Sequence, residues 1–228
     1  MNQPIIISLG GSLIVPKDGI DIEFLKKFRA AILLLCRQGF RFILICGGGT
    51  TARAYQGAAK KLINPNQKML DLLGIEITHI NAHLVRLIFG RAAHPEVVKD
   101  PTKKLNFQEK VLIGAGWKPG CSTDYNAVLS AKTYGAKKII NLTNIDYLYD
   151  KNPTIYKDAK KIKQIDWPGF RKIVGNKWTP GANTPFDPIA SRSAQKLKLE
   201  LILANGKKLE NLKKIIRGDK VFIGSLVR

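Results

Sequence analysis

The chain has 228 residues, of which 45% are hydrophobic, so it can bury the core of one α/β domain or of two small ones. No run approaches the roughly 20 apolar residues of a membrane helix, and the N-terminus lacks the pattern of a signal peptide, so we expect a cytoplasmic protein without a membrane. The three cysteines match no zinc pattern, and their odd number suits a reducing compartment.

The formal net charge of +21 allows two interpretations. A basic face could bind nucleic acid, or surplus lysine could lie on the solvated surface of an enzyme for polyanionic small molecules. No recognisable nucleic-acid module is present, so the solvated surface is favoured and nucleic acid is the less favoured partner. Many of the lysines form pairs scattered along the chain: Lys26–Lys27, Lys60–Lys61, Lys103–Lys104, Lys137–Lys138, Lys160–Lys161, Lys207–Lys208 and Lys213–Lys214.

The first elements predict a strand, a helix and a second strand. Pro4 to Leu9 is a short apolar run that ends in Gly10-Gly11-Ser12, and helical spacing of apolar residues covers roughly 21–38. Phe42 to Cys46 is the second apolar run. A right-handed parallel crossover between these strands brings the glycine turns that follow them to the same edge of the sheet, where open α/β sheets bind ligands.

The second glycine turn is the most informative stretch of the chain. Gly47-Gly48-Gly49-Thr50-Thr51-Ala52-Arg53 leads from the second strand into a helix expected over Ala52 to Leu62, with Thr50 or Thr51 as its N-cap. Free N–H groups and a helix dipole at one point favour a phosphate, and Arg53 adds a forked cation. The stretch is neither a Walker loop nor Gly-x-Gly-x-x-Gly, and a glycine turn made only for packing stays the alternative.

A long helix is expected from Met69 to Gly90, with Asp71 in its first turn, followed by an irregular polar segment over 91–108. His79 and His83 stand one helical turn apart, but no acidic third ligand is near them, so packing is favoured and no metal ligand is assigned. A strand at Val111–Ile113 leads into a third glycine-rich turn and a helix at Thr123–Tyr134.

The remaining elements alternate between strands and helices. They are a strand at Lys138–Leu142, a turn at 147–153, a short helix at Trp167–Val174, a loop at 178–185, a helix at 187–198, a strand at Leu201–Ala204, a helix at 208–216 and a final strand at Val221–Ile223. Four strand-to-loop junctions, at 10–12, 47–53, 114–124 and 143–146, carry Gly, Ser, Thr, Asn or Asp. At one edge of a parallel sheet they predict a site for more than one phosphoryl-bearing ligand.

At these same residues the chain resembles the amino acid kinase superfamily and, within it, uridylate (UMP) kinases of the archaeal type. The matching segments run in family order and include 7–12, 46–53, 70–75 with Asn81-Ala82, 119–124, 142–146 with Tyr149 and Pro153, and 186–190. The resemblance implies a single domain over 1–228, built as a three-layer αβα sandwich around a mainly parallel sheet. It also implies transfer of the γ-phosphate of ATP to UMP with Mg²⁺, in a homo-oligomer that is expected to be a hexamer.

The resemblance also implies roles for individual residues. The residues expected to face ATP are Gly11, Ser12, Gly49, Arg53, Thr143, Asn144, Tyr149 and Asn152. The residues expected to hold UMP are Gly48, Asp71, Trp117, Lys118, Pro119, Gly120, Cys121, Ser122 and Thr123. Those expected to act in catalysis are Gly11, Ser12, Arg53, Asp124 and Asp187, the two aspartates as organisers of basic groups or of the metal.

The chain departs from the superfamily pattern at a few positions. Ser8 stands where many members carry a lysine, although archaeal-type uridylate kinases can lack it, which leaves the cationic role to Mg²⁺, Arg53 or another lysine. Tyr147 takes the place of a usual glycine, and Asn152 that of a common acidic residue, so the segment 147–152 departs from the family pattern at the expected ATP contacts, and Tyr147 could reshape the adenine pocket. Lys118 beside the substrate loop is a candidate phosphate contact or a solvated lysine.

Two rival functions stay open at this point. Another kinase of the superfamily, for isopentenyl phosphate, an amino-acid carboxylate or carbamate, is the nearer one; an isopentenyl phosphate kinase would be expected to place a histidine near the second glycine loop, and none lies between Gly47 and Asn64. The other rival is a nucleotide- or RNA-binding protein without turnover, which only the net charge supports.

Overall fold

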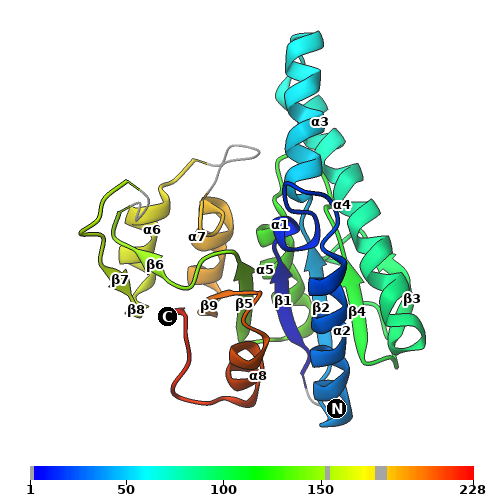
Figure 1. Cartoon of the computed structure of the whole chain (residues 1–228), viewed down its shortest axis with the longest axis vertical. Helices are drawn as coiled ribbons and strands as arrows, with labels where there is room; N and C mark the ends of the chain where they lie inside the picture. The colour runs from blue at the N-terminus through cyan, green and yellow to red at the C-terminus, as the bar shows by residue number, and fades with distance from the viewer. Residues whose placement is uncertain (1–2, 152–154, 178–183) are drawn as a thin grey trace.

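The computed structural model describes residues 3–151, 155–177 and 184–228. Its centre is an eight-stranded sheet in the order β3-β4-β2-β1-β5-β9-β10-β8 (Figure 1). These strands are β1 Ile5–Leu9, β2 Phe42–Cys46, β3 Ala93–Val98, β4 Val111–Gly114, β5 Lys138–Thr143, β8 Gln164–Ile165, β9 Glu200–Asn205 and β10 Ser225–Val227. A small second sheet pairs β6 Leu148–Tyr149 with β7 Lys161–Ile162 in antiparallel fashion.

The large sheet is parallel except at one junction. β1 pairs in parallel with β2 and β5, and β5 with β9, as the strand–helix–strand pattern predicted. β10 runs antiparallel to β9, although α8 lies between them in the chain. The predicted mainly parallel α/β architecture is therefore confirmed.

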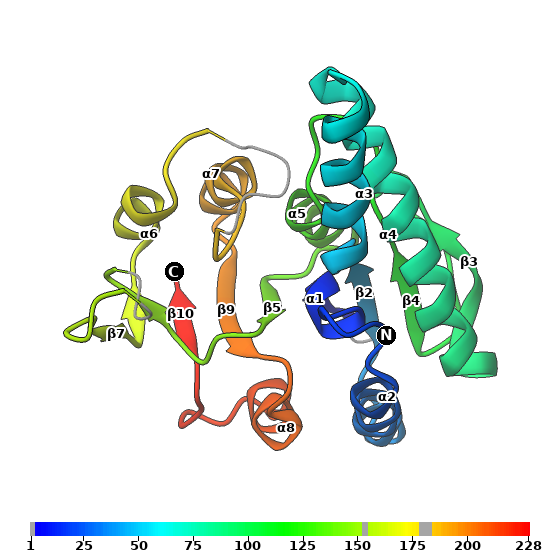
Figure 2. The same cartoon turned by 45° about the horizontal axis from the view of Figure 1, so that its top comes forward.

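Helices cover both faces of the sheet in three layers, as Figure 2 shows. They are α1 Gly11–Ile14, α2 Ile22–Arg37, α3 Gly49–Leu62, α4 Gln67–Phe89, α5 Thr123–Tyr134, α6 Trp167–Val174, α7 Pro188–Lys196 and α8 Leu209–Arg217, with a short 3₁₀ turn η1 at Gly90–Ala92. Side chains of α2, α4 and α8 share one apolar core with one face of the strands, and side chains of α5, α6 and α7 share a second core with the other face. Strand residues such as Ile6 and Ile7 alternate between the two cores, as the period of a strand requires.

The α3–α4 pair extends beyond the rest of the molecule in Figure 1. Among the described residues, Gln67–Ala92 is long and apolar enough to span a membrane by length and composition alone, so the expectation that no such run exists was wrong. A core helix passes the same test, and 44% of its most apolar window is buried in this fold. α4 packs against α3 and against β2, β3 and β4, and its buried Val85 and Phe89 belong to the core it shares with α2.

Three predicted elements, β2, α5 and α6, have the predicted bounds, and most others differ by one to three residues. Segment 91–108 was predicted to be irregular but contains β3, which was missed because Pro95 and Glu96 interrupt the apolar pattern. β3 is an edge strand of the sheet, and an edge strand tolerates proline because only one of its sides is paired. The predicted final strand at Val221–Ile223 was wrong, since the strand is Ser225–Val227. The buried Ser225 hydroxyl, which accepts a hydrogen bond from the Leu148 N–H at 2.8 Å, helps to fix that register.

Candidate active site

The carboxyl ends of the central parallel strands lie side by side. Leu9 of β1 pairs with Cys46 of β2 on one side and with Leu142 of β5 on the other, and Ile45 pairs with Gly114 of β4. The four polar junctions predicted from the sequence therefore start from the same edge of the sheet. This register confirms that the glycine turns open on one side of the molecule.

The first two glycine turns are in direct contact. A Cβ on Gly11 would lie 2.0 Å from the Gly49 nitrogen, closer than any real Cβ contact, so this position requires glycine. Gly49 has a φ of +66°, in the left-handed region that favours glycine. Gly47 donates its N–H to the Leu9 carbonyl at 3.0 Å, which ties the second turn to the end of β1. The two loops therefore form one structural unit.

Main-chain N–H groups of this unit are free to bind an anion. Those of Gly11, Ser12, Gly48 and Gly49 have no hydrogen-bond partner among the described residues. Gly11 and Gly49 are the first residues of α1 and α3, so their N–H groups lack an acceptor within the helix. The predicted N-cap was wrong: Gly48 caps α3 without a side-chain bond, and the helix begins three residues before Ala52. This arrangement suits a phosphate.

Asn81 of α4 holds the second glycine turn in place. Its side chain is buried on α4 with 4% exposure, and its Nδ2 donates to the Gly47 carbonyl at 2.9 Å and to the Gly48 carbonyl at 3.2 Å. Both carbonyls thus point away from the anion site, which leaves the N–H side of the loop free. Sequence reasoning assigned no role to Asn81, although an amide on the apolar side of a long helix was the available signal.

A pocket of about 180 Å³ adjoins the glycine unit. Predicted site residues that line it are Gly48, Gly49, Arg53, Asp71, Cys121, Ser122 and Thr123, and residues that sequence reasoning missed are Ala52, Gln56, Gly74, Ile75, Thr78 and Gly116. The pocket wall does not include the predicted residues Trp117, Lys118, Pro119 and Gly120. The Lys118 ammonium instead lies over the Trp117 ring, 3.8 Å from its centre. Thus the third glycine turn meets the second one across this pocket.

The Asp71 carboxylate links α4 to the loop that carries the third glycine turn. Its Oδ2 accepts a hydrogen bond from the Gly120 N–H at 2.8 Å, and its Oδ1 accepts one from Gln67 Nε2 at 2.9 Å. Asp71 is 7% exposed and is the fifth residue of α4, so its predicted place in the first turn was one turn early. The same loop is tied to α4 at Gly116, whose N–H donates to Thr78 Oγ1 at 2.7 Å and whose carbonyl lies 2.8 Å from His79 Nε2.

Two side chains at the end of the third glycine turn, Ser122 and Cys121, line the pocket in different ways. Ser122 caps α5 by accepting from the Tyr125 N–H at 3.1 Å, so its hydroxyl serves the fold as well as the pocket wall. Burial raises the pKa of the Cys121 thiol, and the nearby Lys118 lowers it only in part. A neutral thiol therefore lines the pocket, and the features of a reactive cysteine are not found here.

Asp124 and Asp187 form a linked pair beneath the glycine turns. Asp124 Oδ1 accepts from the Ser8 hydroxyl at 2.9 Å, and its Oδ2 accepts from the Asp187 N–H at 3.1 Å. Asp124 is partly exposed, but its carboxyl group is removed from solvent. This desolvation raises the pKa of Asp124 to about 7, and the negative charge of Asp187 contributes to the rise. Ser8 thus serves as a neutral partner of Asp124 at the position where many superfamily members carry a cation.

Asp187 caps α7 and keeps one oxygen unused. Its Oδ1 accepts from the Ala190 N–H at 2.6 Å, while its Oδ2 is buried without a hydrogen-bond partner among residues 3–151, 155–177 and 184–228. Burial raises the pKa of this carboxyl above its ordinary value, and the Ala190 N–H, the Ser122 hydroxyl and the Ile189 N–H offset part of that rise. A buried carboxylate oxygen without a partner is a place where a cation would bind favourably.

The residues expected around ATP extend from the same edge along β5. The Thr143 hydroxyl accepts from the Ile145 N–H at 3.2 Å, and the Thr143 carbonyl accepts from the Gly206 N–H at 2.9 Å. Asn144 is exposed, Tyr149 lies partly buried in β6, and neither lines the pocket beside the glycine unit. Asn152 lies outside the described residues.

Comparisons with known proteins agree with this geometry. The family model of the amino acid kinase family matches residues 3–205. The chain is 33% identical over 220 residues to the uridylate kinase of Methanobrevibacter smithii, covering 95% of this chain and 96% of the relative. It is 34% identical over 226 residues to the uridylate kinase of Thermoplasma acidophilum, covering 96% and 95%.

Solved structures give the same result for the fold. The uridylate kinase of Archaeoglobus fulgidus superposes with a TM-score of 0.82 at 26% identity, covering 99% of this chain and all of that one. The UMP kinase of Bacillus anthracis shares the fold with a TM-score of 0.80 at 18% identity, covering 99% and 96%. The chain therefore belongs to the amino acid kinase family and, within it, to the group of the uridylate kinases.

Proposed function

We propose that this chain is an ATP:UMP phosphotransferase that converts UMP to UDP. The observation that carries the proposal is the meeting of two glycine turns, whose unpartnered N–H groups at Gly11, Ser12, Gly48 and Gly49 stand beside a pocket walled by the third turn. The uridylate kinases among the relatives support the identity of the two substrates.

ATP is assigned to the side of the first turn and of β5. The N–H groups of Gly11, Ser12 and Gly49 are placed against its phosphates, and Thr143, Asn144, Tyr149 and Asn152 against its nucleoside. Arg53 is the fifth residue of α3, is exposed and lines the pocket, with Nη2 3.2 Å from the Thr50 hydroxyl. A guanidinium in this position can reach phosphate on either substrate.

UMP is assigned to the pocket beneath α3 and α4, with the loop 117–123 as its outer wall. Asp71 is the acceptor for the ribose hydroxyls, although both of its oxygens are already engaged by Gln67 and Gly120. The pocket volume of about 180 Å³ is below the roughly 300 Å³ of a typical ligand site. For UMP to use Asp71 Oδ2, the Gly120 N–H must give up its hydrogen bond, so we expect the loop 117–123 to shift as UMP binds, with Trp117, Lys118 and Pro119 contacting the nucleotide after that shift.

The reaction needs little covalent chemistry from the protein. A phosphate oxygen of UMP is already a nucleophile, so the protein aligns it with the γ-phosphate and neutralises charge on the moving group. The main-chain N–H groups of both turns can perform both tasks, because they are fixed before the substrates bind. Loss of one such donor typically raises the barrier by about 3 kcal/mol.

Mg²⁺ is assigned to the Asp124–Asp187 pair together with the substrate phosphates. The unused, buried Oδ2 of Asp187 fits a cation, and a Mg²⁺ ion commonly uses one or two carboxylates with phosphates and water. Within the described residues no cluster of three or more His, Cys, Asp or Glu exists, so the protein alone would not complete the shell. When bound, the ion would neutralise charge on the phosphates; Ser8 and the Asp187 N–H would keep Asp124 oriented.

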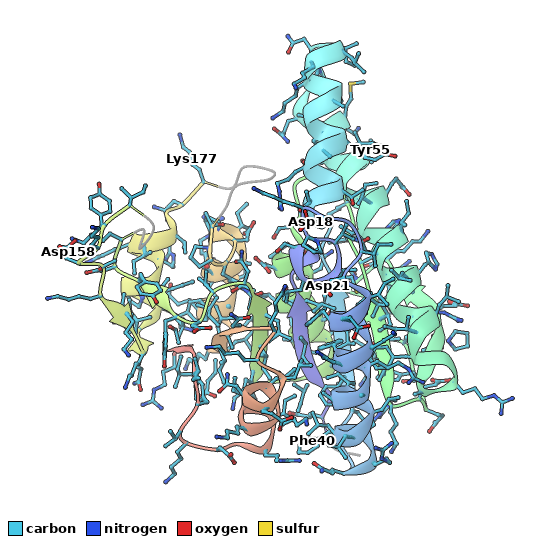
Figure 3. All side chains as sticks on the ribbon, viewed as in Figure 1. Asp18, Asp21, Phe40, Tyr55, Asp158 and Lys177 are labelled. Carbon is cyan, nitrogen blue, oxygen red and sulfur yellow. The ribbon has the colours of Figure 1, made fainter. Side chains whose placement is uncertain are left out.

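We also infer a cytoplasmic homo-oligomer, a hexamer by resemblance, made of single-domain protomers. The projecting α3–α4 pair and the loop between them expose large apolar side chains that a partner copy would cover (Figure 3 labels Tyr55). These residues are Tyr55, Leu62, Ile63, Met69, Leu72, Ile80 and Leu87. The eight-stranded sheet, which joins strands from both ends of the described chain, supports one domain per protomer.

Phosphate transfer from ATP, measured with UMP, CMP, AMP and isopentenyl phosphate as acceptors, tests the proposal. Efficient turnover of UMP above the others is expected. Turnover of isopentenyl phosphate in preference to UMP would assign the chain to another activity of the superfamily. Absence of turnover with every acceptor, together with tight RNA binding at about 0.2 M salt, would identify a binding protein instead.

A further inference from the structure

Helix α8 carries a concentration of positive charge that lies outside the proposed catalytic pocket. It packs beside α2 on the same face of the sheet, as Figure 2 shows, so three of the lysine pairs that are scattered in the sequence come together there. These pairs are Lys26–Lys27 on α2, Lys207–Lys208 immediately before α8, and Lys213–Lys214 on α8.

One groove lies between α8, the residue Tyr147 and the loop before β10. Its volume is about 630 Å³, and its charged lining consists of four lysines against one carboxylate: Lys163, Lys207, Lys208, Lys214 and Glu210. We name it the α8 groove. A second groove of about 510 Å³, on the α2 side of α8, shares Lys207 and Glu210 and adds Lys27, Arg37 and Lys213. The two grooves thus extend one basic surface across the helix.

Not all of this charge is available to a ligand. Lys208 is paired with Asp146 at 2.5 Å, Lys207 lies 3.4 Å from Asp21 at the start of α2 (labelled in Figure 3), and Lys213 is paired with Glu210 at 2.6 Å. Lys163 and Lys214 are exposed and have no ion pair among the described residues. These two lysines are the free cations of the α8 groove.

The α8 groove also has aromatic and apolar walls. Tyr147 and Phe222 line it and are partly buried, so their rings are held in place, while Val221 is 84% exposed. Lys161 stands 5.4 Å from the centre of the Tyr147 ring and adds a cation at the edge of that ring. Cationic groups that follow a backbone, with rings on which bases can stack, are the two features of a site for single-stranded nucleic acid.

We propose that the α8 groove binds single-stranded RNA, as a function additional to phosphate transfer. Lys163 and Lys214 contact the phosphates of the strand, and Phe222 stacks against a base. A double helix does not offer unstacked bases to the rings, so single strands are the ligand that the groove distinguishes. Lys163, Lys214 and Phe222 are not among the residues assigned to ATP or UMP, whereas Tyr147 of the groove adjoins the segment expected to hold ATP, so the test keeps both nucleotides present.

Fluorescence anisotropy with a labelled oligouridylate tests this, with UMP and a non-hydrolysable ATP analogue present to fill the catalytic pocket. The wild-type chain should bind, and its affinity should fall steeply between about 50 and 200 mM salt. Removing two phosphate contacts with the double variant Lys163→Ala/Lys214→Ala should reduce the slope of log K against log salt by about 1.4. Phe222→Leu keeps an apolar side chain and should weaken binding about tenfold.

The matched control is Lys196→Ala/Lys198→Ala, which removes the same charge from exposed positions at the end of α7, on the opposite face of the sheet. It should bind RNA like the wild type, and all variants should keep the wild-type rate with UMP. Equal loss in both double variants would show a non-specific charge effect and overturn the proposal. Three other results would also overturn it. These are displacement of the RNA by UMP and the ATP analogue, equal affinity for single-stranded and duplex RNA, and binding of anionic vesicles without any binding of RNA.

Discussion

The role of Asn81 gives the sharpest test of the glycine unit. Replacing Asn81 by Ala removes the two hydrogen bonds, of 2.9 and 3.2 Å, that hold the Gly47 and Gly48 carbonyls. Each such bond contributes about 1 kcal/mol, and the carbonyls left behind are largely shielded from water, so the free energy of unfolding should fall by about 2–3 kcal/mol. Urea denaturation measures this loss.

The effect on catalysis should be larger than the loss of stability suggests. Asn81 touches neither phosphate in the proposed complex, but without it the turn at 47–49 can rotate and the N–H groups of Gly48 and Gly49 lose their alignment. A displacement of about 1 Å at the reacting groups lowers the rate about 100-fold. We therefore expect kcat for UMP phosphorylation to fall about 100-fold, with a smaller change in the KM of either substrate.

Asn211 supplies a matched control. It is also a buried asparagine, 8% exposed, and it makes two hydrogen bonds of 2.7 Å to the backbone of Ile223, far from the glycine turns. Asn211→Ala should lose about the same stability by the same reasoning, but its kcat should equal that of the wild type at a temperature where both variants are folded. If both variants lose stability and neither loses kcat, the turn at 47–49 is not the phosphate cradle.

Three further predictions concern residues around the pocket. Asp71→Ala should raise the KM for UMP far more than that for ATP, and equal effects on both substrates would remove its assigned place against the ribose. Arg53→Ala should depress kcat by about 100- to 1,000-fold as a charge-stabilising donor, and an unchanged kcat in steady-state assays would make the arginine peripheral. The pKa of Asp124, raised from 3.8 to about 7, means that the folded state binds its proton more tightly than the unfolded state. The free energy of unfolding should therefore fall as the pH rises from about 4 to 7, and Asp124→Asn should flatten this slope in denaturation measured across the window; an identical slope in both would contradict the assignment.

Much of the fold and part of the site follow from local sequence pattern. The buried run Phe42–Cys46 and the helix Thr123–Tyr134 end at the residues predicted, because a continuous apolar run and the caps Ser122 and Gly135 are local signals. Glycine at 11 and 49 is likewise readable from the chain, since a strand followed by consecutive glycines and then a helix leaves few other conformations. The resemblance to uridylate kinases rested on such short segments.

Other features depend on contacts between residues distant in the chain, which no local pattern contains. The strand β10 is held by Ser225, which is hydrogen-bonded to residues of β6 and β7. The role of Asn81 depends on a turn 33 and 34 residues away, and the pKa of Asp124 depends on its burial beside Ser8 and Asp187. The lysine pairs are scattered in the sequence and converge only because α2 and α8 pack on one face of the sheet. Sequence alone determined the central parallel strands, the glycine turns and the family. The tertiary structure decided the edge strands and which polar groups meet, because burial and hydrogen-bond geometry exist only once the layers have packed.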